Sequence, residues 1–179
     1  MDKKRKGLII VFTGYGKGKT TAALGMALRA AGHGMRVLVI QFIKNFKNYG
    51  ELKFVAKHVS GIEIKVLGKG YIGIRGDKLP IAEHRKMAKR AFKLYQEKAK
   101  SGKYNIIILD EINIALKLKL LDLKKVVRLL KRKPKNLHLV LTGRDAPAAI
   151  MKIADLVTEM KEVKHPFRKG ILAQKGIEF

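Results

Sequence analysis

A glycine-rich segment near the start of the chain contains residue types that could bind the phosphates of a nucleotide. It reads TGYGKGKTT from Thr13 to Thr21 and ends in the Gly-Lys-Thr that closes the phosphate-binding pattern G-x-x-x-x-G-K-[ST]. The first glycine of that pattern is missing, because Thr13 stands in its place and Gly14 comes one residue later. Glycines allow backbone N–H groups to converge on phosphate oxygens, Lys19 supplies a point charge, and the Thr20 hydroxyl can bind Mg²⁺. We therefore predict a nucleotide site whose loop is one residue short.

Two acidic residues in the middle of the chain are candidates for holding a metal ion beside those phosphates. The segment NIIILDE, from Asn105 to Glu111, is an apolar run that ends in two carboxylates. In phosphate-loop proteins an acid at such a strand end holds Mg²⁺ directly or through water. We predict Thr20 and Glu111 as ligands of Mg²⁺ or Mn²⁺, with Asp110 less suited to direct contact. A buried strand whose acid only caps the next helix would have the same pattern.

Apolar runs alternate with amphipathic stretches along the whole chain, and this alternation predicts the elements that position these residues. Runs rich in Ile, Val and Leu predict buried strands at Leu8–Phe12, Arg36–Phe42, Ile62–Leu67, Tyr104–Leu109, Leu137–Leu141 and Asp155–Glu159. Helices are predicted at Thr20–Ala31, Ile81–Lys100, Leu121–Arg132 and Pro147–Ala154. The order implies an α/β fold with a doubly wound, mainly parallel sheet of about six strands, like that of P-loop NTPases. The glycine segment then lies between a strand and a helix, where phosphate loops are found.

Composition limits the class of protein. The 179 residues, 47% of them apolar, are most simply one domain over 1–179, with 1–7 as a basic N-terminal arm. The absence of cysteine excludes disulfides, thiolate metal sites and cysteine nucleophiles, and it suits a cytoplasmic protein. No segment approaches the roughly 18 apolar residues of a membrane span. We expect a protein without a membrane anchor.

The charge balance is strongly positive, with 40 Lys and Arg against 14 Asp and Glu, or +26 in total. This could be a surface for nucleic acid or another polyanion. It could also be a lysine-rich solvated surface as in heat-adapted proteins, although Glu usually rises with Lys in those. No aromatic-and-basic RNA-binding pattern accompanies the charge, so we expect nucleic-acid binding to be incidental at most.

The residues alone leave the reaction open. A hydrolase would use an arginine finger, for which Arg144 or Arg29 could be nominated, and a kinase would need a general base and an arginine-rich lid. No lid-like segment is evident, and none of the five histidines has the spacing of a base or a metal site. These patterns keep one alternative open. It is an ATPase or kinase that acts on another substrate, with or without association with nucleic acid.

Longer blocks of the sequence resemble the P-loop type of ATP:corrinoid adenosyltransferase, the enzyme family that adenosylates vitamin B12 precursors. The blocks run from Leu8 to Phe179, nearly the whole chain. They are more specific than a generic phosphate loop because they include the shortened loop and the C-terminal tail. They read TGYGKGKTTAALGMALRAAGHGMRVLVIQFIK, YGE at Tyr49–Glu51, ILDEI at Ile108–Ile112, LTGRDAP at Leu141–Pro147, and ADLVTEMKEVKHPFRKGILAQKGIEF.

The resemblance implies a function in vitamin B12 coenzyme biosynthesis or salvage. A reduced Co(I) corrinoid attacks C5′ of ATP, triphosphate leaves, and the loop holds this leaving group because ATP lies in the reverse sense from ordinary P-loop enzymes. Lys17 and Lys19 would stabilise the leaving group, no general base is needed, and Arg29 is a candidate for contact with the nucleoside or its phosphates. An external reductase such as a flavoprotein is implied as a partner. The expected ATP contacts are Gly14, Tyr15, Gly16, Lys17, Gly18, Lys19, Thr20, Thr21, Arg29 and Arg144.

The chain departs from the family pattern on the corrinoid side. Asn45 replaces a glycine, and the aromatic segment of the family appears as GYIG, with Tyr71 for phenylalanine and Gly73 where tryptophan would stand. Tyr71 and Phe42 are the expected corrinoid contacts. Some members carry an N-terminal helix that covers the active site across a dimer. Only 1–7 precede the first strand here, which leaves open whether the chain forms a homodimer.

Overall fold

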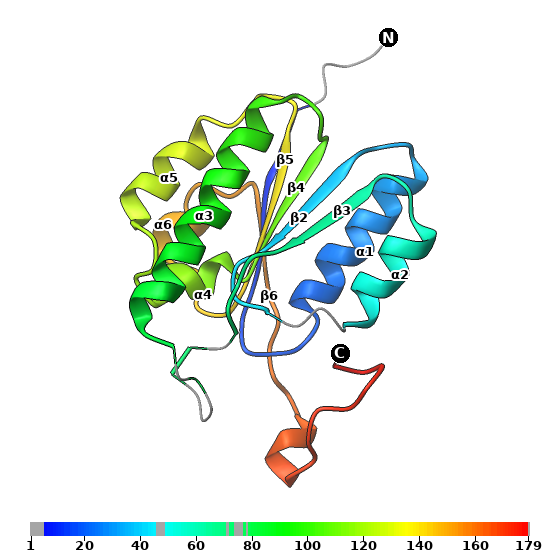
Figure 1. Ribbon diagram of the computed structural model, residues 1–179, viewed down its shortest axis with the longest axis vertical. Coiled ribbons are helices and arrows are strands. Elements are labelled where there is room, and N and C mark those ends of the chain that lie inside the picture. The colour runs from blue at the N-terminus through cyan, green and yellow to red at the C-terminus, as the bar shows by residue number, and fades with distance from the viewer. Residues whose placement is uncertain (1–5, 46–48, 71, 74–76, 78, 179) are drawn as a thin grey trace.

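The computed structural model describes residues 6–178 apart from 46–48, 71, 74–76 and 78. Six parallel strands form one sheet in the order β3-β2-β4-β5-β1-β6 (Figure 1). All six strands predicted from the sequence are confirmed, with ends that agree to within two residues. The strands are β1 (Ile9–Thr13), β2 (Val37–Gln41), β3 (Ile62–Val66), β4 (Ile106–Asp110), β5 (His138–Thr142) and β6 (Leu156–Glu159).

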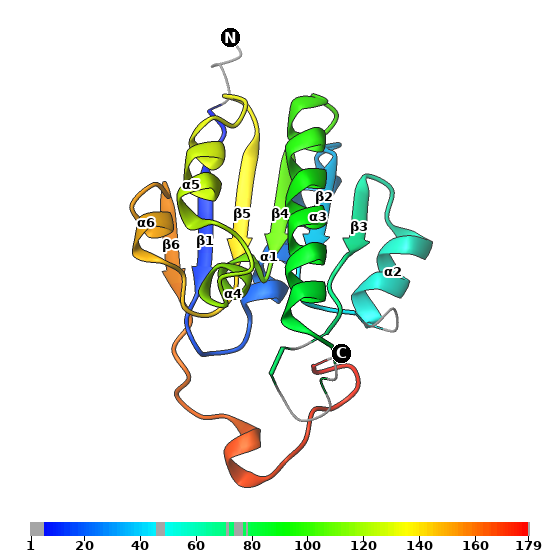
Figure 2. The same cartoon turned by 60° about the vertical axis from the view of Figure 1, so that its left-hand side comes forward.

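Helices cover both faces of the sheet, which confirms the doubly wound α/β fold. Figures 1 and 2 show α1 and α2 on one face and the other helices on the opposite face. The four predicted helices are present, and α2 and α4 are additional. The helices are α1 (Lys19–Gly32), α2 (Gly50–His58), α3 (Ile81–Lys100), α4 (Ile112–Lys117), α5 (Leu123–Lys131) and α6 (Ala148–Met151), followed by a 3-10 turn at Pro166–Lys169.

The central strands are apolar throughout because both of their faces are buried. Alternate side chains along β4 belong to different cores: Ile107 and Leu109 pack with α3, α4 and α5, whereas Ile106 and Ile108 pack with α1. This arrangement produces continuous apolar runs in place of the alternation of a half-exposed strand. In β6, the last strand in the sheet order, all four residues are exposed.

The parallel arrangement brings the ends of four strands to one edge of the sheet. Gln41 pairs with Asp110 in the register of β2 and β4, and Phe12 pairs with Thr142 in that of β1 and β5. The carboxyl ends of parallel strands are where ligands bind in open α/β sheets. The polar residues Gln41, Asp110 and Thr142, each the last residue of its strand, therefore meet at the edge where the glycine loop follows β1.

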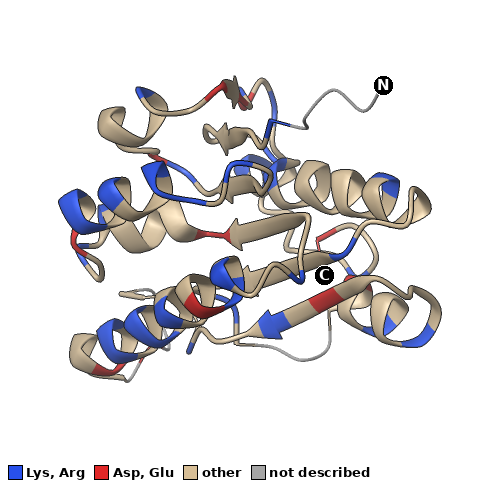
Figure 3. Ribbon diagram, turned by 90° about the horizontal axis from the view of Figure 1, so that it is seen from above, with Lys and Arg blue, Asp and Glu red and all other residues tan. Residues whose placement is uncertain are grey.

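The chain after β6 passes beyond this carboxyl edge and returns toward it at the C-terminus (Figure 2). Lys and Arg, blue on the ribbon of Figure 3, lie along the helices and are more frequent there than Asp and Glu, drawn in red. Over the part of the chain that is described, no helix has the length and apolar character needed to cross a membrane.

Candidate nucleotide and metal site

The loop between β1 and α1 ends at a helix start suited to an anion. Gly18 has φ 104°, a left-handed conformation that glycine adopts without strain, and α1 begins at the next residue. The first N–H groups of a helix have no partner within it and carry partial positive charge. The first turn of α1 contains no acidic residue that would neutralise this end.

Two of the loop glycines have no room for a side chain, because the chain that follows β6 packs against them. A Cβ at Gly14 would lie 2.5 Å from the Met160 carbonyl oxygen, and one at Gly16 would lie 2.7 Å from that of Lys161. The Gly16 N–H donates a 2.7 Å hydrogen bond to the Met160 carbonyl. This N–H is therefore bonded to the chain that follows β6, and contact of Gly16 with ATP stays a prediction.

The two loop lysines lie in different environments. Lys19 is buried, and its ammonium donates a 2.6 Å hydrogen bond to the Gly16 carbonyl. Burial lowers the pKa of Lys19, and the negative charge of Glu111 partly opposes this. Lys17 is more exposed and forms an ion pair with Glu178 of the C-terminal tail. Only Lys19 is held under the loop; Lys17 reaches outward.

Arg144 and Tyr15 meet beside the loop, whereas Arg29 does not reach it. The Arg144 guanidinium lies over the Tyr15 ring, 5.6 Å from its centroid, and the Tyr15 hydroxyl donates a 2.8 Å hydrogen bond to Asp145. Arg29 is exposed in the last turn of α1, about 15 Å from Lys19 by the helical rise. The structure thus brings one of the two predicted arginines to the loop. Thr21, in the first turn of α1, is exposed.

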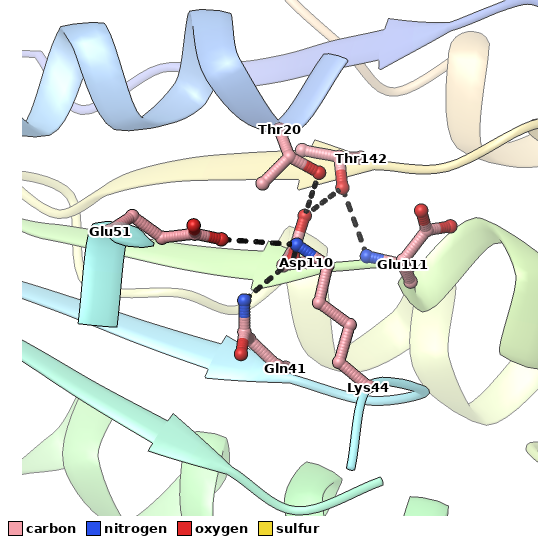
Figure 4. Close-up of polar contacts among 7 residues, drawn as sticks. All are labelled: Thr20, Gln41, Lys44, Glu51, Asp110, Glu111 and Thr142. Atoms are coloured by element: carbon pink, nitrogen blue, oxygen red, sulfur yellow. Dashed lines mark hydrogen bonds and ion pairs between the residues drawn. The ribbon is translucent and has the colours of Figure 1, made fainter. Parts of the chain in front are cut away.

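Asp110 is the centre of the polar network at the strand ends (Figure 4). Its side chain is fully buried, and its Oδ1 accepts hydrogen bonds from the hydroxyls of Thr20, at 2.8 Å, and Thr142, at 2.7 Å. Its Oδ2 accepts from Gln41 Nε2 at 3.2 Å and lies 3.6 Å from the Lys44 ammonium. Four residues, from α1, β5, β2 and the connection between β2 and α2, therefore converge on one carboxylate.

Glu111 adjoins Asp110 but makes different contacts. It has the left-handed φ of 64°, which is uncommon for a residue with a side chain, and its N–H donates to the Thr142 hydroxyl at 2.9 Å. Its carboxylate faces Gly143, where a Cβ would lie 3.1 Å from Oε2. Burial, together with the charge of Asp110, raises the pKa of Glu111 to about 7, against the pull of Lys44, Lys19 and Arg144.

Lys44, Glu51 and Gln41 belong to the site but were not singled out from the sequence. The Lys44 ammonium lies 3.4 Å from Glu51, in the first turn of α2, and 4.8 Å from the centroid of the Tyr49 ring. Burial alone would lower the pKa of Lys44, but the charges of Asp110 and Glu51 outweigh burial and raise it. A polar glutamine at the end of the otherwise apolar run VLVIQ was the available signal for Gln41.

Of the two predicted corrinoid contacts, the structure describes only Phe42. Phe42 is 2% exposed and packs in the core with α3, and its N–H donates a 3.0 Å hydrogen bond to the Asp110 carbonyl. Tyr71 lies outside the described residues. Asn45, the residue that replaces a family glycine, donates a 3.1 Å hydrogen bond to the Lys69 carbonyl and contacts the position of Gly70.

Comparison with known proteins identifies the family to which this arrangement belongs. A family model described as ATP:corrinoid adenosyltransferase BtuR/CobO/CobP matches residues 5–179. The chain belongs to this ATP:corrinoid adenosyltransferase family. The corrinoid adenosyltransferase of Sinorhizobium sp. is 46% identical over 97% of this chain and 81% of its own length. Those of Pseudomonas aeruginosa and Escherichia coli K12 are 39% and 37% identical, over 99% and 97% of this chain and 86% of each relative.

Membership of the ATP:corrinoid adenosyltransferase family confirms the resemblance and the reaction class. The family transfers the adenosyl group of ATP to the cobalt of a corrinoid, in B12 biosynthesis or salvage. ATP and a corrinoid are thus its substrates, and an enzyme of this type is confirmed. The alternative of an ATPase or kinase with another substrate has no support in the matches.

Proposed function

We propose that the glycine loop and the first turn of α1 bind the triphosphate of ATP as the leaving group of adenosyl transfer. The observation that carries this proposal is the position of Lys19: its ammonium is buried beneath a shortened loop, at the positive end of α1. A buried cation at a helix start stabilises negative charge that develops on phosphate. Arg144, Lys17 and the first N–H groups of α1 surround the same loop and would share this charge.

The step needs a nucleophile, an in-line arrangement and a stabilised leaving group. The electron pair of Co(I) forms the Co–C5′ bond, the C5′–O5′ bond breaks, and its electron pair leaves on triphosphate. No proton has to be removed from the nucleophile, so the protein acts by positioning and by charge. A hydrogen bond to a charged group typically contributes about 1.5–3 kcal/mol, and Lys19 is the residue to which we assign this role.

The residues at the strand ends fit a magnesium ion. The Thr20 hydroxyl and the carboxylates of Asp110 and Glu111 are the hard oxygen donors that Mg²⁺ prefers. Burial, together with the charge of Asp110, raises the pKa of Glu111, and a dication would favour its charged form. Among the described residues, no group of three or more His, Cys, Asp or Glu could hold a metal by itself. Mg²⁺ in nucleotide sites is held by one or two carboxylates plus substrate phosphates. When bound, it would neutralise charge on the triphosphate.

The corrinoid would bind beyond the carboxyl edge, next to the segment that contains Tyr71. Co(II) must be reduced to Co(I) before attack, so an external reductase such as a flavoprotein would supply the electron. Gly73 donates its N–H to Asp77 at 3.0 Å, and Ile72 packs against the core. These two contacts hold the described residues that follow position 71, and contact of Tyr71 with the corrinoid stays a prediction.

Anaerobic incubation with ATP, Mg²⁺ and chemically reduced corrinoid tests the proposal. The visible spectrum reports formation of the cobalt–carbon bond, and ion chromatography measures the phosphate products. We expect one triphosphate for each adenosylated corrinoid. Release of ADP or orthophosphate as the primary product would overturn the assignment of the loop to a triphosphate leaving group.

A further inference from the structure

The Lys44 ammonium is the cation that lies against the metal-site carboxylate on the side away from the glycine loop (Figure 4). Its side chain is 11% exposed and comes from the connection between β2 and α2. The ammonium is 3.6 Å from Asp110 Oδ2 and 3.4 Å from Glu51 Oε1. An unpaired buried charge is costly, so the two carboxylates are what allow the Lys44 ammonium to lie at this depth. Its contact with Asp110 makes Lys44 part of the site.

The two oxygens of Asp110 have different partners. Oδ1 accepts from two neutral hydroxyls, those of Thr20 and Thr142, whereas Oδ2 faces Gln41 and the positive charge of Lys44. The Thr20 side is the one that adjoins the glycine loop. A metal ion bound between Thr20 and Asp110 would therefore share the carboxylate with Lys44, one cation at each oxygen.

The charges around the carboxylates are balanced before any ligand arrives. Asp110 and Glu111 are the acids, Lys44 and Lys19 are the nearest cations, and Arg144 and Glu51 lie at the margin. A dication that approaches Asp110 meets a carboxylate whose charge is already opposed by the Lys44 ammonium. The triphosphate of ATP adds several negative charges next to Lys19 and changes this balance in favour of a metal.

We propose that Lys44 is a positioning residue that acts as the resident counter-ion of Asp110 and makes binding of the divalent cation depend on nucleotide. The inference rests on the proposed metal site at Thr20 and Asp110. It assigns to Lys44 an effect on metal affinity that a purely structural ion pair would not have: loss of the charge should strengthen binding of a metal to the nucleotide-free protein.

Mn²⁺ binding to the nucleotide-free full chain, measured from the electron paramagnetic resonance signal of free Mn²⁺, tests this inference. Lys44→Gln keeps a hydrogen-bond donor for Asp110 and removes the charge, and Lys44→Met removes both. We expect each variant to bind Mn²⁺ at least about tenfold more tightly than the unmodified protein. Lys44→Arg retains the charge and should bind within about threefold of it.

Lys133→Met is the matched control, because Lys133 is also a partly buried lysine. It lies near the amino end of β1, where its ammonium donates a hydrogen bond to the Gly7 carbonyl. Its removal should leave Mn²⁺ affinity unchanged. Thermal melts establish that each variant is folded, and Lys44→Gln decides the result if Lys44→Met does not fold. Unchanged or weaker Mn²⁺ binding by folded Lys44→Gln would overturn the inference.

A second measurement separates this inference from the metal site on which it rests. Water proton relaxation distinguishes a ternary complex of unmodified protein, Mn²⁺ and ATP from Mn²⁺–ATP in solution. We expect the ternary complex to form. If it does not form, the proposed metal site is wrong; if it forms but Lys44→Gln leaves the nucleotide-free affinity unchanged, only the role of Lys44 is wrong.

Discussion

The hydroxyl of Thr20 donates a 2.8 Å hydrogen bond to Asp110 and so joins the first turn of α1 to the end of β4. This contact links the two predicted halves of the site, the phosphate loop and the acidic strand end. Asp110 is therefore better placed than Glu111 to bind a metal together with Thr20, because the Glu111 carboxylate is directed toward Gly143. Direct binding of metal by Glu111 stays a prediction.

Lys19→Ala should impair ATP use far more than Lys17→Ala. Lys19 is buried below the loop, where a charged hydrogen bond contributes about 1.5–3 kcal/mol, and its loss should lower kcat/KM for ATP at least about tenfold. Lys17 is partly exposed and is already paired with Glu178, so its loss should have a smaller effect. Steady-state kinetics with varied ATP give both values. Equal losses would contradict the different roles assigned to the two lysines.

The stability of the metal-free protein should fall as pH rises from about 4.5 to beyond 7. The pKa of Glu111 is raised to about 7 from an ordinary value of 4.5, so the folded protein holds this proton more tightly than the unfolded chain. That stabilisation is fully present below pH 4.5 and is lost as pH rises through 7. Thermal melts between pH 5 and 8 should show the fall, and Glu111→Gln should flatten it. A variant with the same pH profile as the unmodified protein would exclude Glu111 as the source.

Gly16→Ala should lower stability, whereas Gly25→Ala should not. A Cβ at Gly16 would lie 2.7 Å from the Lys161 carbonyl oxygen, and overpacking of this kind costs about 1–3 kcal/mol. Gly25 is exposed within α1, and its Cβ would meet nothing within 4 Å, so alanine there should stabilise the helix by about 0.5–1 kcal/mol. Urea denaturation measures both. Destabilisation of similar size in the two variants would show that helix α1, and not the chain after β6, is responsible.

Glu178→Gln should increase the affinity for inorganic triphosphate severalfold. The Glu178 carboxylate forms an ion pair with Lys17 in the nucleotide-free protein, and triphosphate must compete with it for this cation. The matched control is Glu162→Gln, which breaks an ion pair of the same tail with Arg168 and leaves the pair of Lys17 and Glu178 in place. Isothermal titration calorimetry with triphosphate compares the two. A decrease in affinity for Glu178→Gln would mean that Glu178 supports the loop and does not compete with the ligand.

Much of the fold was predictable because the buried strands are continuous apolar runs with clear boundaries. α4 was not predicted, because INIALK is short, is separated from β4 by Glu111 alone and has four of its six residues buried. The loop and Asp110 could be located from motif spacing. The role of Lys44 could not, because it depends on the pairing of β2 with β4, which no local pattern determines. The second function of Gly14 and Gly16, packing against Met160 and Lys161, likewise depends on the position of β6 beside β1.

The fate of the 5′ oxygen of ATP tests most directly whether the loop holds triphosphate as a leaving group. ATP labelled with ¹⁸O at the bridge between C5′ and the α-phosphorus should be used in anaerobic turnover with reduced corrinoid, and the products analysed by mass spectrometry. Cleavage of the C5′–O5′ bond predicts that all of the label leaves in triphosphate. Label that remains with the nucleoside would show cleavage between phosphorus and oxygen, and it would contradict the proposed role of Lys19 and the glycine loop.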